Sequence, residues 1–104
     1  MNIMATMDPA QMRANAGRAS ALMRALANEN RLMILCQLVP GERSVGDLAE
    51  ALDLRQAAVS QQLALLRKDG LVAPRRDGQT VYYALAGDAA RRVLDVLYEL
   101  FCVP

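Results

Sequence analysis

Two cysteines are the residues of this chain with the most distinctive chemistry. Cys36 and Cys102 stand far apart in a sequence of 104 residues and form no Cys-x-x-Cys pair, so the pattern disfavours a thiol oxidoreductase. In a reducing compartment both thiols should stay reduced, and a bond between them would be regulatory instead of a permanent staple. The alternative is structural, because cysteine is among the most buried residue types: Cys36 would then belong to the core, and Cys102 would be incidental.

Histidine is absent from the chain, which removes the commonest metal ligand and general base. We therefore expect no catalytic residues, no metal ligands and no cofactor. A protein that responds to a metal or metalloid ion stays an alternative, because a dimer would pool four thiols.

A second group of chemically useful side chains lies in the segment QAAVSQQLALLRK, residues 56–68. Val59, Leu63 and Leu66 have the spacing of one buried helical face. The opposite face then carries Ala57, Ser60, Gln61, Ala64 and Lys68. Alanine allows close approach to a thymine methyl group, and serine and glutamine donate and accept at base edges, so this face suits the DNA major groove. The alternative is an ordinary solvated helix face.

Residues 71–76 and 79–85 have the character of β-strands, and the dipeptide Asp77-Gly78 between them favours a two-residue hairpin turn. Such a hairpin after a reading helix is a wing. Arginines beside its tip suit phosphate or minor-groove contact, although exposed arginines near a turn can also serve solubility alone. Of the neighbouring Tyr82 and Tyr83, we expect one to be packed and the other exposed.

The charge distribution supports a nucleic-acid surface in this part of the chain. Net charge is only +1, so the chain is no general polycation, but residues 55–79 hold five Lys and Arg against two Asp. We assign to DNA binding the following residues: Arg55, Gln56, Ala57, Ser60, Gln61, Ala64, Lys68, Arg75, Arg76 and Gln79.

The elements that must position these residues form one domain, residues 9–104, after a disordered N-terminus over residues 1–8. Helix starts are predicted at Pro9 with Asp8 as cap, at Asn28, and after the cap Ser44. The helix that Asn28 opens ends at Pro40-Gly41, and two more helices are predicted over 56–68 and over 88–103. The second is apolar around most of its circumference and should be buried. The fold is thus mainly α with a small β-hairpin, a winged helix-turn-helix of five helices plus wing.

The last predicted helix is apolar on several faces, so it should pack against its own core and against another chain. We expect a homodimer through the first and last helices. No run of about 18 apolar residues is present, and the N-terminus lacks the pattern of a secretory signal. A cytoplasmic protein with no membrane partner is the expectation.

Four segments together carry a resemblance to a known family. They are NENRLMILCQLV, SVGDLAEAL, QAAVSQQLALLRKDGLV and RRDGQTVYYAL, which cover most of the chain. In combination they resemble the ArsR family of winged helix-turn-helix repressors, dimers that bind palindromic operators. Metal-sensing members carry a Cys-Val-Cys-Asp-Leu run where this chain has Ser44 to Leu48, so metal sensing there is not expected. A small capping serine is frequent in the family where this chain has Arg55, which puts the start of that helix in question.

The positions of the two cysteines resemble the sulfide-responsive branch of that family, the BigR and SqrR type. The resemblance implies that the reduced dimer binds its operator, and that persulfides or polysulfides convert Cys36 and Cys102 to a disulfide or polysulfide bridge that releases DNA. It also implies control of genes for sulfide oxidation or detoxification. A winged helix that binds only protein is a further alternative, and it predicts that Ser60, Gln61 and Arg76 can be replaced without effect on any operator.

Overall fold

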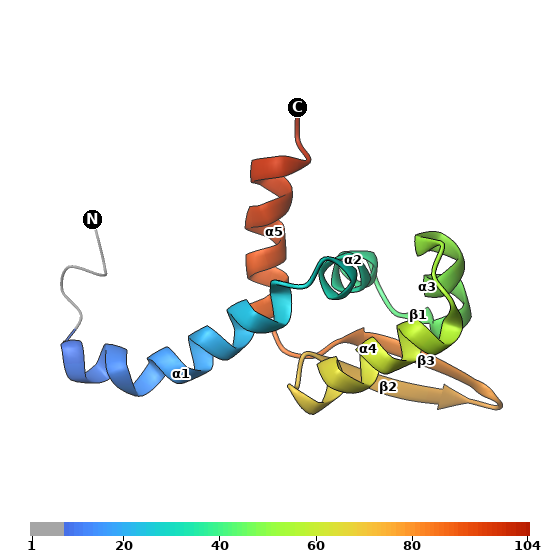
Figure 1. The fold of residues 1–104 in the computed structure, drawn as a ribbon, viewed down its shortest axis with the longest axis horizontal. Helices are drawn as coiled ribbons and strands as arrows, with labels where there is room; N and C mark the ends of the chain where they lie inside the picture. The colour runs from blue at the N-terminus through green and yellow to red at the C-terminus, as the bar shows by residue number, and fades with distance from the viewer. Residues whose placement is uncertain (1–7) are drawn as a thin grey trace.

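Five helices and a three-stranded antiparallel sheet make up residues 8–104, the part of the chain described by a computed structural model (Figure 1). In chain order they are α1 Pro9–Leu26, α2 Glu29–Leu38, β1 Arg43–Ser44, α3 Val45–Leu52, α4 Gln56–Lys68, β2 Val72–Asp77, β3 Thr80–Leu85 and α5 Ala89–Phe101. The predicted five helices and hairpin are confirmed. The predicted disorder of residues 1–8 lies outside the described residues, apart from Asp8.

Side-chain caps define where three of the helices begin. Asp8, Asn28 and Ser44 each accept a hydrogen bond of 3.1 Å from a backbone N–H two or three residues later. These are the capping residues that the sequence predicts, and each satisfies a donor that the helix itself leaves free. Helix α4 differs, because its N-cap residue is Arg55, which makes no side-chain cap hydrogen bond. The helix nevertheless begins at Gln56, as expected.

The core lies where α2, α3, α4 and the sheet meet. Its largest fully buried side chains are Ile34, Leu35, Leu38, Leu48, Leu63, Leu66 and Val59. The predicted buried face of α4 is confirmed. For α2 the prediction of general burial is wrong on one side, because Met33 is 43% exposed and Cys36 is also exposed. Neighbouring elements cover only part of its circumference.

The sheet has the order β1-β3-β2, and Gly78 and Gln79 form the turn at the tip of the wing, because Asp77 still pairs with Thr80. The predicted turn at Asp77-Gly78 is therefore wrong by one residue: Asp77 ends β2, and Gln79 belongs to the turn instead of β3. Gly78 has a φ of 62°, the left-handed conformation that such a turn requires. The third strand, β1, was not predicted, since two residues carry no alternation. One tyrosine was expected to pack and its neighbour to be exposed, and Tyr83 does pack against the core. The second half of the expectation is wrong, because Tyr82 is partly buried and its ring is in contact with the Arg75 guanidinium.

Helices α1 and α5 project away from this winged body (Figure 1). Only Ala25 of α1 is buried, and the radius of gyration of 15.6 Å exceeds the roughly 13 Å of a compact domain of 100 residues. Large apolar side chains remain exposed on both helices and at the C-terminal end, among them Met23, Val93, Val96, Tyr98, Leu100, Phe101 and Val103. Across residues 8–104, no helix has the length and hydropathy needed to cross a membrane.

Candidate nucleic-acid interface and thiol site

Helix α4 presents the predicted polar face to solvent. Val59, Leu63 and Leu66 are fully buried against the core and fix the rotation of the helix about its axis. The outward side chains are all exposed: Ala57, Ser60, Gln61, Ala64 and Lys68. The turn from α3 passes through Asp53 in the left-handed conformation, at φ 53° and ψ 49°. This arrangement is a helix-turn-helix whose second helix has a free face of small and amide-bearing residues.

Two predicted residues lie at the start of α4. Arg55 and Gln56 are exposed, and the Arg55 side chain makes no capping contact with the helix. Helix N-termini carry free backbone N–H groups that bind phosphate oxygens. The Arg55 guanidinium beside them also binds phosphate oxygens. This end of α4 therefore suits the DNA backbone better than a base edge.

The wing supplies the remaining predicted residues. Arg75, Arg76 and Gln79 are exposed on or beside the hairpin tip. Arg75 differs from the others because its guanidinium already forms a bidentate ion pair with Glu42. Sequence reasoning missed Glu42, which stands 33 positions earlier and belongs to no recognisable motif with Arg75.

The two cysteines are both free and exposed. Exposure of Cys36 excludes the alternative in which it is an ordinary core residue. Its side chain borders a cavity of about 340 Å³ between α2 and α5, whose lining consists of Cys36, Val39, Pro40, Leu94, Asp95 and Tyr98. Cys102 stands one helical turn beyond Tyr98, and its N–H donates to the Tyr98 carbonyl at 2.9 Å. The face of α5 that closes the cavity therefore continues toward Cys102.

The surroundings of the Cys36 thiol do not favour its reactive thiolate form. Burial raises its pKa above the ordinary value, and a negative charge on Cys102 raises that pKa further. Since both causes favour the neutral thiol, Cys36 at neutral pH holds less thiolate than an unperturbed cysteine.

Alkylation of Cys36 should therefore be slow at pH 7 and accelerate with pH beyond the range in which free cysteine levels off. Below its pKa the thiolate fraction, and with it the rate, rises about tenfold per pH unit, and an ordinary thiol levels off near pH 8.5. Mass-resolved iodoacetamide labelling of Cys36 measures this profile. In Cys102→Ser the profile should move toward lower pH; a plateau below pH 8 in the unmodified protein would contradict the assignment.

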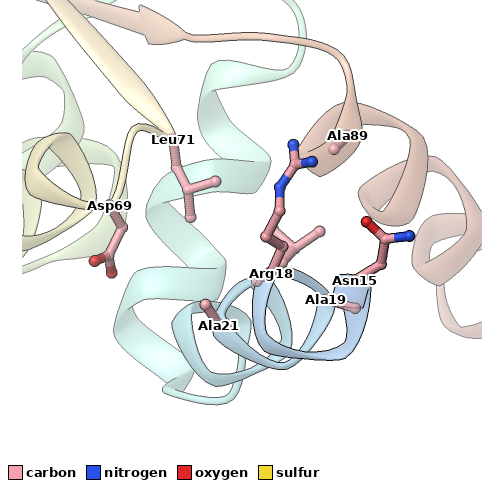
Figure 2. Close-up of a pocket in the computed structure, with 8 residues that line it drawn as sticks. Asn15, Arg18, Ala19, Ala21, Asp69, Leu71 and Ala89 are labelled. Carbon is pink, nitrogen blue, oxygen red and sulfur yellow. The ribbon is translucent and has the colours of Figure 1, made fainter. Parts of the chain in front are cut away.

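A larger cavity of about 450 Å³ lies between α1, the turn after α4 and the start of α5 (Figure 2). Its lining is Asn15, Arg18, Ala19, Ala21, Leu22, Asp69, Leu71 and Ala89. Figure 2 shows the Arg18 side chain extending from α1 toward Ala89. The cavity contains neither cysteine and none of the predicted DNA-binding residues. It reflects the incomplete packing of α1 on the rest of the chain.

Within residues 8–104 no group of three or more His, Cys, Asp or Glu side chains is placed to share a metal ion. The site as described thus consists of one exposed DNA-compatible face on α4, a wing with exposed arginines, and two exposed thiols, Cys36 beside the cavity between α2 and α5 and Cys102 at the end of α5.

Comparison with known proteins identifies the family. Residues 28–73 match the model of the "Bacterial regulatory protein, arsR family". The "Transcriptional activator HlyU" of Vibrio cholerae is 45% identical over 98 residues, which cover 94% of this chain and 91% of that protein. This chain belongs to the ArsR family. The resemblance drawn from the four sequence segments is confirmed.

Solved structures of other transcriptional regulators share this fold. The transcriptional repressor BigR from Xylella fastidiosa is 36% identical, with a TM-score of 0.86 over 94% of this chain and all of that one. A possible ArsR-family regulator from Mycobacterium bovis, described as a homodimeric winged helix-turn-helix DNA-binding domain, is 32% identical with a TM-score of 0.76, over 90% of this chain and 86% of that one. The winged helix-turn-helix prediction is confirmed, and this ArsR-family protein is a transcriptional regulator, not an enzyme.

Proposed function

We propose that this ArsR-family regulator is a homodimeric repressor that leaves its operator when Cys36 and Cys102 become covalently linked. The observation that carries the proposal is the position of Cys36. Its exposed thiol borders a cavity whose other wall is the face of α5 that leads to Cys102. In the proposed mechanism the free thiols permit binding and the linked pair prevents it.

Dimerisation through α1 and α5 supports the DNA-binding half of the proposal. The exposed apolar side chains of these helices need a partner surface. In a two-fold symmetric dimer, the same apolar surface of a second copy would cover them. The dimer would place its two α4 helices about 34–36 Å apart on a palindromic operator. The face of α4 would read base edges, while Arg55, Arg76 and Gln79 would contact the backbone.

Reactive sulfur species supply the chemistry of the bridge without another oxidant. A low-molecular-weight persulfide transfers its outer sulfur to one protein thiol, which becomes a persulfide, and leaves as a thiol. The second protein thiol then attacks the inner sulfur of that persulfide, so a disulfide forms and H₂S departs with the remaining proton. If more sulfur atoms are transferred before closure, the bridge is longer.

The length of the bridge provides selectivity. A direct disulfide needs Cα atoms within about 7 Å, whereas a chain of three or four sulfurs spans a wider gap between two helices. Persulfides would then act better than peroxide. Intact-mass measurement after each treatment tests this step: persulfide should add sulfur atoms, and equal reaction with both reagents without added sulfur would exclude selectivity.

The effect of linking the thiols would reach the DNA-binding helix through α2. Arg91 of α5 already donates a hydrogen bond of 2.8 Å to the Val39 carbonyl at the end of α2, three residues after Cys36. Helix α2 also packs against α3 and α4. A bridge at Cys36 therefore ties the proposed dimerisation helix to the body that carries α4, and it would change the distance between the two reading helices.

The operator-binding prediction follows from typical coupling energies. About 1–3 kcal/mol of coupling corresponds to a loss of affinity between roughly fivefold and a hundredfold. A gel shift on the promoter next to the gene should show this loss for persulfide-treated protein, and full binding after reduction. Cys36→Ser should bind operator as the reduced protein does and ignore persulfide. If persulfide also releases the Cys36→Ser protein from operator DNA, the proposed role of Cys36 is refuted.

The genes under control would be those for sulfide oxidation or detoxification, and the protein would act in the cytoplasm. Zinc or arsenite titration of the same protein–operator complex separates this proposal from a metal-responsive repressor. Release by metal without any change in mass would favour the alternative.

A further inference from the structure

The guanidinium of Arg75 in the wing is held by a carboxylate from outside the wing. Its Nε lies 3.0 Å from Glu42 Oε2, and one Nη lies 2.5 Å from Glu42 Oε1, so the pair is bidentate. On the other side the guanidinium carbon is 4.9 Å from the centre of the Tyr82 ring, its cross-strand neighbour. A cation–π contact and a bidentate ion pair together fix this side chain on the wing surface.

The backbone holds Glu42 in place for this contact. Glu42 lies in the short loop between α2 and β1, where the Gly41 N–H donates to the Leu38 carbonyl at 3.1 Å. The next residue, Arg43, pairs with Tyr83 of β3. Because the loop is anchored on both sides of Glu42, its carboxylate stays beside the wing.

The ion pair changes the charge that the wing offers to DNA. Within the described chain Arg76 forms no ion pair, whereas the charge of Arg75 is neutralised by Glu42. The hydrogen bonds from Arg75 lower the pKa of Glu42, so the carboxylate stays ionised through the neutral range. A phosphate oxygen that approaches Arg75 meets a carboxylate already bound in the same bidentate geometry.

We propose that Glu42 competes with DNA phosphate for Arg75 and so limits the affinity of the reduced protein for its operator. The proposal rests on the DNA-binding role of the wing described above. Exposed ion pairs contribute little to stability, so Arg75 can exchange the carboxylate for a phosphate. The displaced carboxylate then lies near the phosphate backbone and repels it.

Glu42→Gln in the reduced protein tests the proposal. The substitution keeps the size of the side chain and removes its charge, so operator affinity should rise and its salt dependence should steepen. Removal of the displaced carboxylate from beside the backbone leaves one more uncompensated positive charge at the interface, which is equivalent to about one additional phosphate contact. It makes the slope of log K against log salt steeper by about 0.9, an extra loss of about 3.5-fold between 50 and 200 mM salt. Fluorescence anisotropy across that range measures it. Glu29→Gln, which removes one exposed carboxylate at the start of α2, should leave the slope unchanged.

A double-mutant cycle shows whether Arg75 is the group in competition. Arg75→Gln should weaken binding more in the Glu42→Gln protein than in the otherwise unchanged protein, because only there is the guanidinium fully available to phosphate before it is removed. Equal losses of affinity in both backgrounds, or weaker binding by Glu42→Gln, would overturn the competition. If neither the reduced parent protein nor any variant binds operator, both the DNA-binding proposal and the competition proposal fail. If Glu42→Gln binds operator normally with an unchanged salt slope, only the competition proposal fails.

Discussion

Glutamate in place of Gln61 is expected to weaken operator binding by at least about 30-fold. Gln61 is exposed at the centre of the outward face of α4, where a base edge would enclose its side chain. A carboxylate there has no cation to pair with and faces a polyanion, and an unpaired charge buried in an interface costs about 2–5 kcal/mol, with each 1.4 kcal/mol worth tenfold. Anisotropy titration of the reduced protein with operator DNA gives the ratio directly.

The matched control for that experiment is Gln11→Glu. Gln11 is exposed in the first turn of α1, and the substitution adds the same charge to the chain. Figure 1 shows that the N-terminal end of α1 lies well away from α4 and the wing. Its effect on operator affinity should be small and should vanish as salt screens long-range charge. If both variants lose affinity equally, net charge explains the result, and the assignment of α4 as the reading helix is wrong.

Alanine in place of Leu63 is expected to cost about 2–5 kcal/mol of unfolding free energy. Leu63 is fully buried in the core that joins α4 to α2 and the wing. Its loss would leave a cavity that the neighbouring helices cannot fill without moving. Chemical denaturation at one fixed protein concentration measures the change, because the stability of a dimer depends on concentration.

Leu65 offers a control on the same helix. It stands two positions away and is 46% exposed, so Leu65→Ala removes the same atoms from a site that already contacts water. This variant should lose far less stability than Leu63→Ala. Comparable losses would mean that α4 is rotated about its axis relative to the structure, and the outward face used for DNA would then have to be reassigned.

Much of the fold can be predicted from local chemistry. Asp8, Asn28 and Ser44 signal helix starts because their side chains accept a backbone hydrogen bond, and each caps a helix in the structure. The glycine of the wing turn, Gly78, and the spacing of buried residues along α4 are equally local, although the turn begins one residue later than predicted. Strand β1 escapes such reasoning, since its two residues become a strand only by pairing with β3.

The candidate site depends more on tertiary structure. The outward face of α4 follows from helical periodicity, so those residues could be named in advance. The apolar composition of α2 predicts burial all round, whereas the exposed side that carries Cys36 depends on which neighbours the fold provides. The pairing of Glu42 with Arg75 likewise arises because a loop and a wing meet, and no spacing along the chain encodes it.

Peptide mapping of persulfide-treated protein under non-reducing conditions tests the central claim most directly. The sample to be mapped is the fraction that has lost its operator affinity. We expect one linked peptide pair, which contains Cys36 and Cys102 joined by two or more sulfur atoms and which disappears on reduction as DNA binding returns. Loss of DNA binding with Cys36 and Cys102 on separate, unlinked peptides would contradict it.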